Sequence, residues 1–210
     1  MYETFVEHDE GFLVMEYVEG SSLQDIFQAH ARARTWLSPE EALDYLKQLL
    51  DGLSFAHSHA IFHRDIKPSN ILVSRVGVVK LVDFGLAKSM VVPIEPGGNT
   101  GFGARTGTLA FMSPEAANGM KLDHRTDIFS AGLVGYILLT GRHPFNHPSS
   151  AFAVHDLIKE SGFDCEPLAH RQVKGLSESA CALINAMLHK DREQRCQSVQ
   201  RVLRTNTRRW

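Results

Sequence analysis

Residues 63–70 read HRDIKPSN, which places a carboxylate, an ammonium and a carboxamide close together at Asp65, Lys67 and Asn70. Phosphoryl transfer uses such groups, because it depends on an oriented hydroxyl and on cations that neutralise phosphate charge. In that chemistry Asp65 accepts or orients the proton of the attacking hydroxyl, and Lys67 places a point charge on the transferring group. Asn70 offers a neutral oxygen to a hard cation such as Mg²⁺. Taken alone, the stretch also fits a solvated surface loop.

A second acidic motif follows within the same region of the chain. Residues 71–85, ILVSRVGVVKLVDFG, read as two short strands around a tight turn at residues 75–77. A hairpin this short brings Asp83, at its exit, back beside Asn70. The sequence therefore predicts two oxygen ligands for a pair of metal ions.

Local patterns predict an α+β chain that is mostly helical. Residues 4–20, TFVEHDEGFLVMEYVEG, read as two strands joined by an acidic turn that closes on Gly11. Ser21 or Ser22 is expected to begin a short helix. A stronger helix start stands at residues 38–41, Ser-Pro-Glu-Glu, and this helix is expected to run to about residue 57.

The second half of the chain is predicted to be irregular at first and then helical. From residue 88 to residue 105 the chain is rich in glycine and proline, which is typical of a functional loop. Apolar residues at helical spacing then predict further helices, at residues 127–140, about 150–160, 177–189 and 198–204.

The composition fits one globular domain and excludes some classes of partner. The chain has 210 residues, 43% of them hydrophobic, with 22 basic and 24 acidic residues, so we expect an apolar core and no nucleic-acid partner. The most apolar run, residues 131–140, is too short to span a membrane. The odd number of cysteines, three, favours free thiols and a cytoplasmic location. The oligomeric state is left open.

Four ordered motifs identify a family resemblance. They are HRDIKPSN (63–70), LVDFGLAK (81–88), GTLAFMSPE (107–115) and DIFSAG (127–132). Together they resemble the signature set of the eukaryotic-type protein kinases, and the resemblance covers the chain from about residue 5 to about residue 204. A lysine two residues after the acid of HRDIKPSN, and a Gly-Thr pair ahead of Ser-Pro-Glu, are the pattern of serine/threonine kinases.

This resemblance implies a catalytic set. Asp65 would be the catalytic-loop base, and Asn70 and Asp83 would be the metal ligands. Lys67 would complete the site, and Thr108 would hydrogen-bond the Asp65–Lys67 pair on the side of the substrate hydroxyl. The expected reaction is transfer of the γ-phosphate of ATP to a serine or threonine of a protein substrate. The expected ion is Mg²⁺, with Mn²⁺ as the alternative.

The resemblance also assigns the nucleotide side of the site. FLVMEYVEGSSL, residues 12–23, is similar to the last small-lobe strand and the hinge. Met15 then falls at the gatekeeper position, Glu16 and Val18 are hinge contacts, and Leu72 lies beneath the adenine ring. Residues 1–20 would be the last small-lobe strands and hinge of a kinase domain spanning 1–210, residues 21–204 the large lobe, and residues 83–115 the activation segment.

Structural and regulatory roles follow from the same resemblance. His63 would pack with Phe84, next to Gly85, in the apolar spine of the lobe. Glu115 would pair with Arg195 in the interior. Asp127 would hydrogen-bond the backbone of the catalytic loop. Arg64 and Lys88 would bind a phosphate carried by Thr106 or, less favoured, by Thr100.

One part of the family pattern has no counterpart in this sequence. No lysine occurs before Lys47, so the strand lysine that clamps the nucleotide phosphates is absent, and GFGARTG at residues 101–107 lies in the wrong context to replace a glycine-rich loop. We therefore expect an N-terminally truncated kinase domain with weak ATP binding and slow turnover. A non-catalytic kinase-like interaction module is the main alternative, and a small-molecule phosphotransferase is a weaker one.

Overall fold

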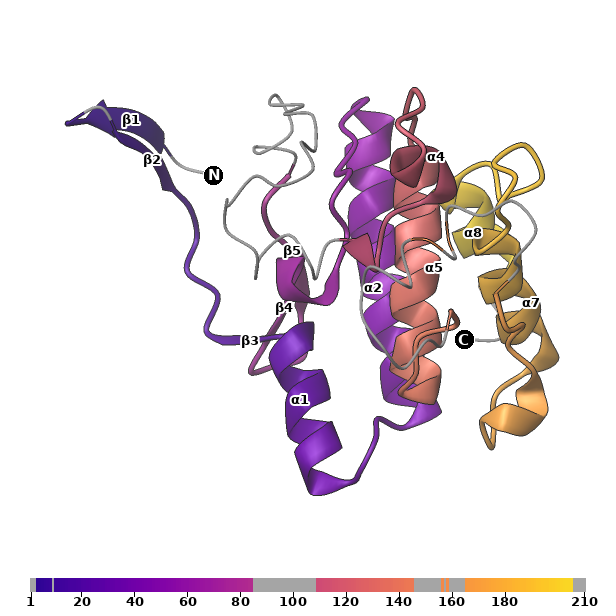
Figure 1. The fold of residues 1–210 in the computed structure, drawn as a ribbon. Coiled ribbons are helices and arrows are strands. Elements are labelled where there is room, and N and C mark those ends of the chain that lie inside the picture. Colours follow the sequence, from indigo (N-terminus) through magenta and orange to yellow (C-terminus); the bar gives the residue numbers. More distant parts are fainter. Residues whose placement is uncertain are drawn as a thin grey trace.

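The computed structural model describes residues 3–8, 10–84, 109–145, 156, 158 and 165–205. The chain begins with strands and continues mostly with helices (Figure 1). This arrangement confirms the α+β, mostly helical class expected from the sequence. The described elements, in chain order, are β1 (Glu3–Glu7), β2 (Glu10–Val14), β3 (Gly20–Ser22), α1 (Leu23–Ala33), α2 (Pro39–Ser58), the short 3₁₀ helix η1 (Pro68–Asn70), β4 (Ile71–Ser74), β5 (Val79–Leu81), α4 (Pro114–Ala117), α5 (Arg125–Thr140), the 3₁₀ helix η2 (His170–Gln172), α7 (Glu178–Met187) and α8 (Val199–Thr205).

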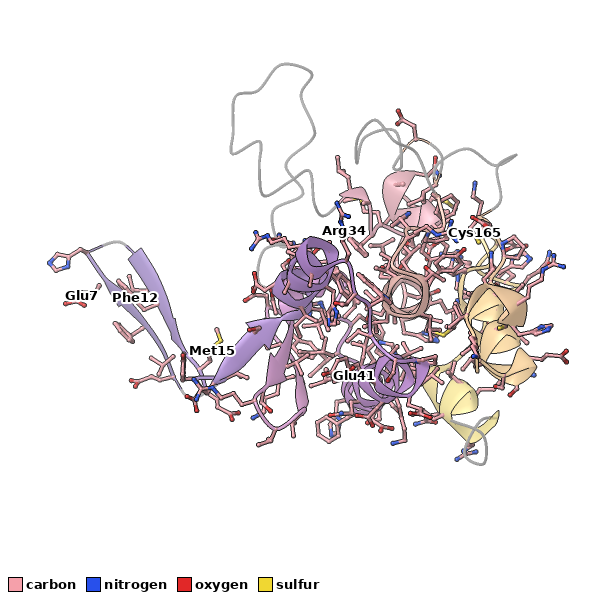
Figure 2. The ribbon with its side chains drawn as sticks, turned by 90° about the horizontal axis from the view of Figure 1, so that it is seen from below. Glu7, Phe12, Met15, Arg34, Glu41 and Cys165 are labelled. Carbon is pink, nitrogen blue, oxygen red and sulfur yellow. The ribbon has the colours of Figure 1, made fainter. Side chains whose placement is uncertain are left out.

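Strands β1 and β2 form an antiparallel hairpin that projects from the helical body (Figure 1). Phe5 lies opposite Phe12 in the register, and their rings stack with centroids 5.1 Å apart. Both side chains stay 41% exposed, because among the described elements β1 and β2 pack chiefly on each other. Figure 2 shows Phe12 on this hairpin and Met15 on the segment that connects it to the body.

A second sheet joins this connection to the body of the molecule. Its strand order is β3-β4-β5, and all pairs are antiparallel. Gly20 opens β3 opposite Ser74, and a Cβ at Gly20 would lie 2.0 Å from the carbonyl oxygen of Val73. Only glycine permits this close approach of two backbones. The pairing of β3 with β4, which places residues 15–19 next to the body, therefore depends on Gly20.

We expect Gly20→Ala to lower the free energy of unfolding by about 1–3 kcal/mol, because the clash is with backbone and must shift the strand. Gly52→Ala is the matched control. It adds the same methyl group inside helix α2, where the new Cβ meets only Leu81 Cδ1 at 3.5 Å, and alanine favours a helix over glycine. Urea unfolding of both variants checks the prediction, and equal stabilities would contradict it.

The first two large helices begin at serine caps, as the sequence indicates. The Ser22 hydroxyl accepts from the Asp25 backbone N–H and the Asp25 carboxylate accepts from the Ser22 N–H, which makes a complete capping box for α1. Ser38 caps α2 by accepting from the Glu41 N–H, with proline in the first turn. Helix α1 spans 11 residues and is longer than the short helix expected.

Helix α5 is the centre of the core. It is buried from Thr126 to Leu139, and it packs against α2 on one side and α7 on the other (Figure 1). A helix that is apolar on all faces is stable only when it is covered all round. Gly132 and Gly135 allow this close packing, since a Cβ at either position would lie 3.0 Å or less from a side-chain atom of α7 or α2.

The predicted helices at 127–140, 177–189 and 198–204 are confirmed as α5, α7 and α8, and the hairpin around residues 75–77 is confirmed as β4–β5. The helix expected at about 150–160 lies almost entirely outside the described residues. Strand β3 and helix α4 were not predicted, because three- and four-residue elements carry too little periodicity. None of the helices within the described ranges is long and apolar enough to cross a membrane.

Candidate active site

Three polar side chains converge where the chain leaves α2 and enters β4. The Lys67 ammonium lies 3.0 Å from Asp65 Oδ2. The Asn70 amide nitrogen donates to the backbone carbonyl of Asp65 at 2.9 Å and to its Oδ2 at 3.2 Å. Both donors thus fix the orientation of the Asp65 carboxylate. The amide oxygen of Asn70 accepts a long hydrogen bond from the Ser69 hydroxyl at 3.5 Å.

The β4–β5 hairpin returns Asp83 to this loop. The Val82 N–H donates to the carbonyl of Asn70 at 3.0 Å, so the residue that follows Val82 lies beside the end of η1. Asp83 is exposed, and no described residue hydrogen-bonds or ion-pairs with its carboxylate. A carboxylate and an amide oxygen held side by side on adjacent backbone are the ligand types that Mg²⁺ prefers. The residues present therefore fit a magnesium site.

Two residues of this region have a left-handed backbone. The φ angle is 62° at both Arg64 and Asp83, where a side chain other than glycine is strained. Such strain persists only where surrounding contacts hold it, and it clusters at functional sites. The hydrogen bonds from the Val82 and Arg64 backbone supply such contacts here.

His63 links the loop to the strand that carries Asp83. Its Nε2–H donates to the carbonyl of Val82 at 2.9 Å, and its Nδ1 accepts from the Asp65 N–H at 3.3 Å. The ring lies 4.6 Å from the ring of Phe84, as the family resemblance implies. Burial lowers the pKa of His63 below 6.5, against smaller opposing effects of the Val82 carbonyl and nearby carboxylates. The neutral ring is the form that makes both hydrogen bonds.

Asp127 holds the same loop from the core. Its Oδ1 accepts from the Arg64 N–H at 2.7 Å, and its Oδ2 accepts from the His63 N–H at 2.8 Å. His57, near the end of α2, donates from Nε2 to the same Oδ2 at 2.9 Å. The Asp127 side chain is only 1% exposed, so this buried carboxylate is satisfied by three donors from two segments.

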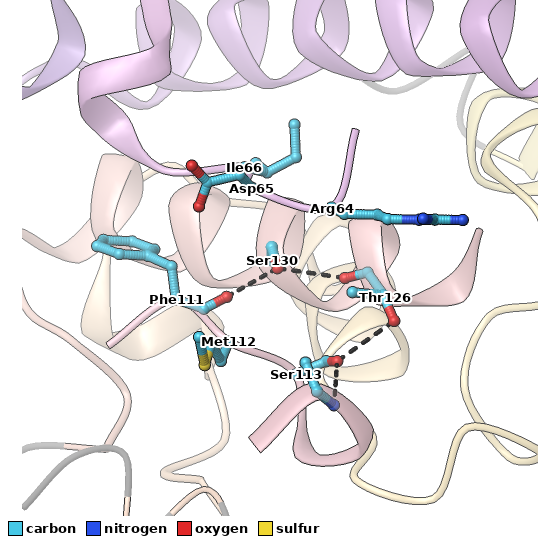
Figure 3. A pocket seen from close by; sticks show the side chains of 9 residues that line it. Arg64, Asp65, Ile66, Phe111, Met112, Ser113, Thr126 and Ser130 are labelled. Carbon is cyan, nitrogen blue, oxygen red and sulfur yellow. Dashed lines mark hydrogen bonds between the residues drawn. The ribbon is translucent and has the colours of Figure 1, made fainter. Parts of the chain in front are cut away.

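A loop that precedes α4 faces Asp65 across a small cavity (Figure 3). Arg64, Asp65 and Ile66 line one side, and the other side is lined by Phe111, Met112, Ser113, Ala116, Thr126 and Ser130. The Ser130 hydroxyl donates to the Phe111 carbonyl at 2.7 Å, which ties this loop to α5. The cavity lies beside the acid that would meet an attacking hydroxyl, so this loop forms the opposite wall of the candidate site.

Glu115 and Arg195, which the resemblance pairs, form a buried bidentate ion pair. The Arg195 Nη1 and Nη2 atoms lie 2.7 and 2.9 Å from the two carboxylate oxygens of Glu115. The remaining N–H groups of the guanidinium donate to the backbone carbonyls of Arg125, His189 and Lys190. All five donors of Arg195 are therefore used, which fixes α4 against the segment that follows α7.

The residues assigned to the nucleotide side lie on the connection between the two sheets and on β4. Met15 is 41% exposed, and Glu16 forms an ion pair with Lys80 of β5. Val18 is partly buried, and Leu72 pairs with Lys80 in the sheet register. The ion pair thus joins the segment next to Met15 to the hairpin that carries Asp83.

Several assigned residues lie outside the described residues: Gly85, Lys88, Thr100, Thr106 and Thr108. Arg64 is described, and its guanidinium lies 5.8 Å from the ring of Phe62. Three residues of this region were not found from the sequence: His57, Ser130 and His143. Their spacing carries no signal, since each acts through a contact with a residue far away in the chain.

The chain is similar to known protein kinases. Residues 1–206 match the family model described as "Protein kinase domain". The chain is 35% identical over 189 residues to the serine/threonine-protein kinase PknB of Mycobacterium tuberculosis, which covers 89% of this chain and 28% of that protein. It is 37% identical over 182 residues to the serine/threonine-protein kinase drp72 of Corynebacterium efficiens, covering 86% of this chain and 32% of that protein.

A third relative, the serine/threonine-protein kinase PknA of Corynebacterium glutamicum, is 42% identical over 140 residues, or 66% of this chain and 28% of that protein. The chain thus spans about a third or less of the length of these relatives. The family model covers nearly all of the chain, and the site described above lies within the matched range. The chain therefore belongs to the protein kinase domain family.

Proposed function

We propose that this chain transfers the γ-phosphoryl group of ATP to serine or threonine hydroxyls of protein substrates. The observation that carries the proposal is the convergence of Lys67 and Asn70 on the Asp65 carboxylate, with Asp83 returned beside Asn70 by a backbone hydrogen bond. Asp65 is placed to orient the acceptor hydroxyl and take its proton, and Lys67 to neutralise charge on the transferring group.

Asn70 and Asp83 would hold Mg²⁺ through their side-chain oxygens. When bound, the ion supplies positive charge that links the nucleotide phosphates to the protein and neutralises charge that develops on them. The chain's own contribution is orientation. His63 fixes the strand before Asp83 through the Val82 carbonyl, and Asp127 fixes the backbone of the catalytic loop.

The remaining assignments are part of the same proposal. Met15, Glu16, Val18 and Leu72 would contact the adenine, and Thr108 would lie on the substrate side. Arg64, with Lys88, would bind a phosphate on Thr106. Residues 1–20 would act as the last small-lobe strands and hinge, residues 21–204 as the large lobe, and residues 83–115 as the activation segment. The reaction would take place in the cytoplasm.

Magnesium-dependent nucleotide binding tests the metal ligands. We expect Asp83→Asn to weaken ATP binding at least about tenfold in the presence of Mg²⁺ and to leave binding in EDTA unchanged, because a charged ligand to the metal is lost. Titration of the 210-residue chain with a fluorescent ATP analogue measures both. Asp51→Asn, which removes a carboxylate from the exposed face of α2, is the control. Equal losses with and without Mg²⁺ would contradict the assignment.

The choice of acceptor separates the proposal from its two rivals. We expect labelled phosphate to appear on serine and threonine of casein, measured in a single turnover with the chain in excess over ATP. Transfer to an aminoglycoside in place of casein would favour a small-molecule phosphotransferase. Binding of MgATP with no transfer to either acceptor would favour a kinase-like interaction module.

A further inference from the structure

His143 makes two hydrogen bonds that the catalytic assignments do not use. It lies just after α5, and its Nε2 is 2.9 Å from the carbonyl oxygen of Ala110. Its Nδ1 is 3.2 Å from the backbone nitrogen of Phe145. A carbonyl can only accept and a backbone N–H can only donate, so the two contacts define one tautomer, with the proton on Nε2.

The Ala110 carbonyl belongs to the loop that faces Asp65. Phe111 and Met112, which follow Ala110, line the cavity opposite the acid (Figure 3). The next carbonyl, that of Phe111, accepts from the Ser130 hydroxyl. Two successive carbonyls are therefore held by side chains of α5 and the turn after it. The His143 ring also packs edge-on against the Phe111 ring at 5.9 Å.

The surroundings of His143 keep its ring neutral. Burial lowers the pKa of His143 from 6.5 to about 4, although the hydrogen bond to the Ala110 carbonyl opposes the shift. Two aromatic rings border it, since the ring of Phe145 lies 6.0 Å away in addition to that of Phe111. At pH 7 the single tautomer that fits both backbone partners is therefore the form present.

We propose that His143 is a positioning residue for the protein substrate, because its Nε2–H holds the Ala110 carbonyl and so fixes the loop at residues 109–113 opposite Asp65. The inference rests on the proposed function for the identity of the substrate, but the positioning of the loop can be measured without turnover. Removing the donor leaves the Ala110 carbonyl without this partner. It frees one attachment of the loop and leaves those of Ser130 to Phe111 and of Ser113 to Thr126.

Three substitutions separate the two hydrogen bonds of the ring. His143→Gln keeps an N–H donor near the position of Nε2, and His143→Asn keeps only an acceptor near the position of Nδ1. His143→Leu keeps the bulk and removes both groups. Arg142→Leu, at the exposed neighbouring position, is the matched control.

Hydrogen exchange in the intact chain, read on a proteolytic fragment that covers residues 109–113, is the first measurement. We expect exchange to become about tenfold faster in the Leu and Asn variants, whereas the Gln variant and the Arg142→Leu control stay close to the original chain. Nitrogen chemical shifts of the His143 ring should show the proton on Nε2. A proton on Nδ1, or equal exchange in all variants, would overturn the proposal.

Substrate dependence is the second measurement. In single-turnover labelling of casein, the Leu and Asn variants should need about tenfold more casein for half-saturation, with the ATP dependence and the maximal rate unchanged. A loss of maximal rate with unchanged casein dependence would also overturn the proposal. If the original chain labels no casein, the proposed function fails, while the exchange measurement still decides whether His143 fixes the loop.

Discussion

Asp65→Asn is expected to lower the rate of phosphoryl transfer by about 10²–10⁴-fold, the contribution typical of a positioned general base. The amide has nearly the shape of the carboxylate, so the backbone contact from Asn70 to the Asp65 carbonyl is retained. What is lost is the negative oxygen that would take the hydroxyl proton and that lies 3.0 Å from Lys67. Single-turnover transfer of labelled phosphate to casein measures the effect, and urea unfolding shows whether the fold is intact.

Asp51→Asn is the matched control for this prediction. It removes the carboxylate of another lysine–aspartate pair, Lys47–Asp51 at 2.9 Å, on the exposed face of α2. We expect its transfer rate to equal that of the original chain, because an exposed pair contributes little to stability and none to the site. A rate for Asp65→Asn within a few-fold of the control would remove Asp65 from the role of base.

Arg195→Met is expected to lower the free energy of unfolding by about 3–5 kcal/mol, because it leaves the Glu115 carboxylate buried without its partner. The guanidinium is fully buried, and the Glu115 side chain is only 4% exposed. Adding Glu115→Leu to the same chain should restore part of the loss, since no buried charge then remains. Arg195→Lys, made in place of Arg195→Met, should also lose stability, because an ammonium cannot reproduce five donors in a planar fork. Urea unfolding measures each variant.

The exposed pair Arg75–Glu19 provides the control for this cycle. Its atoms are 2.8 Å apart, but its side chains are 75% and 61% exposed, so Arg75→Met should cost less than about 1 kcal/mol. Losses of equal size for Arg195→Met and Arg75→Met would contradict the structural role of the buried pair.

Acid should weaken the same contact. Burial raises the pKa of Glu115, but the hydrogen bonds and charge of Arg195 lower it by more. The resulting pKa is below the ordinary value of 4.5. A carboxyl whose pKa is lowered by folding stabilises the folded state above its unfolded pKa. Its contribution is therefore lost as the pH falls below about 4.5. The doubly substituted chain, which has no carboxyl at position 115, should lack this part of the pH dependence.

Most secondary structure could be predicted from the sequence because its signals are local. Ser38 and Pro39 mark the start of α2, and the apolar run of α5 marks a buried helix, since capping and periodicity depend on residues a few positions apart. The sequence predicted the candidate site for the same reason. Its members are Asp65, Lys67, Asn70 and Asp83. These residues lie on one loop and one short hairpin, so their proximity follows from short-range chain geometry.

The contacts that hold the site from outside could not be predicted in this way. Ser130 binds the Phe111 carbonyl, and His143 binds that of Ala110, only because α5 passes beneath the loop that precedes α4. His57 reaches Asp127 across a separation of 70 residues. No local pattern encodes a hydrogen bond between a side chain and a distant backbone group.

The sequence by itself determined the helices α1, α2, α5, α7 and α8, the two hairpins and the acid–lysine–amide group, because each depends on residues close together in the chain. Only the tertiary structure decided how that group is held, by Asp127 beneath the loop and by His63 toward Val82. It also decided that His143 contacts the loop on the opposite side of the cavity. The physical reason is that orientation within the site depends on buried hydrogen bonds between segments, and such bonds exist only after the core around α2 and α5 has packed.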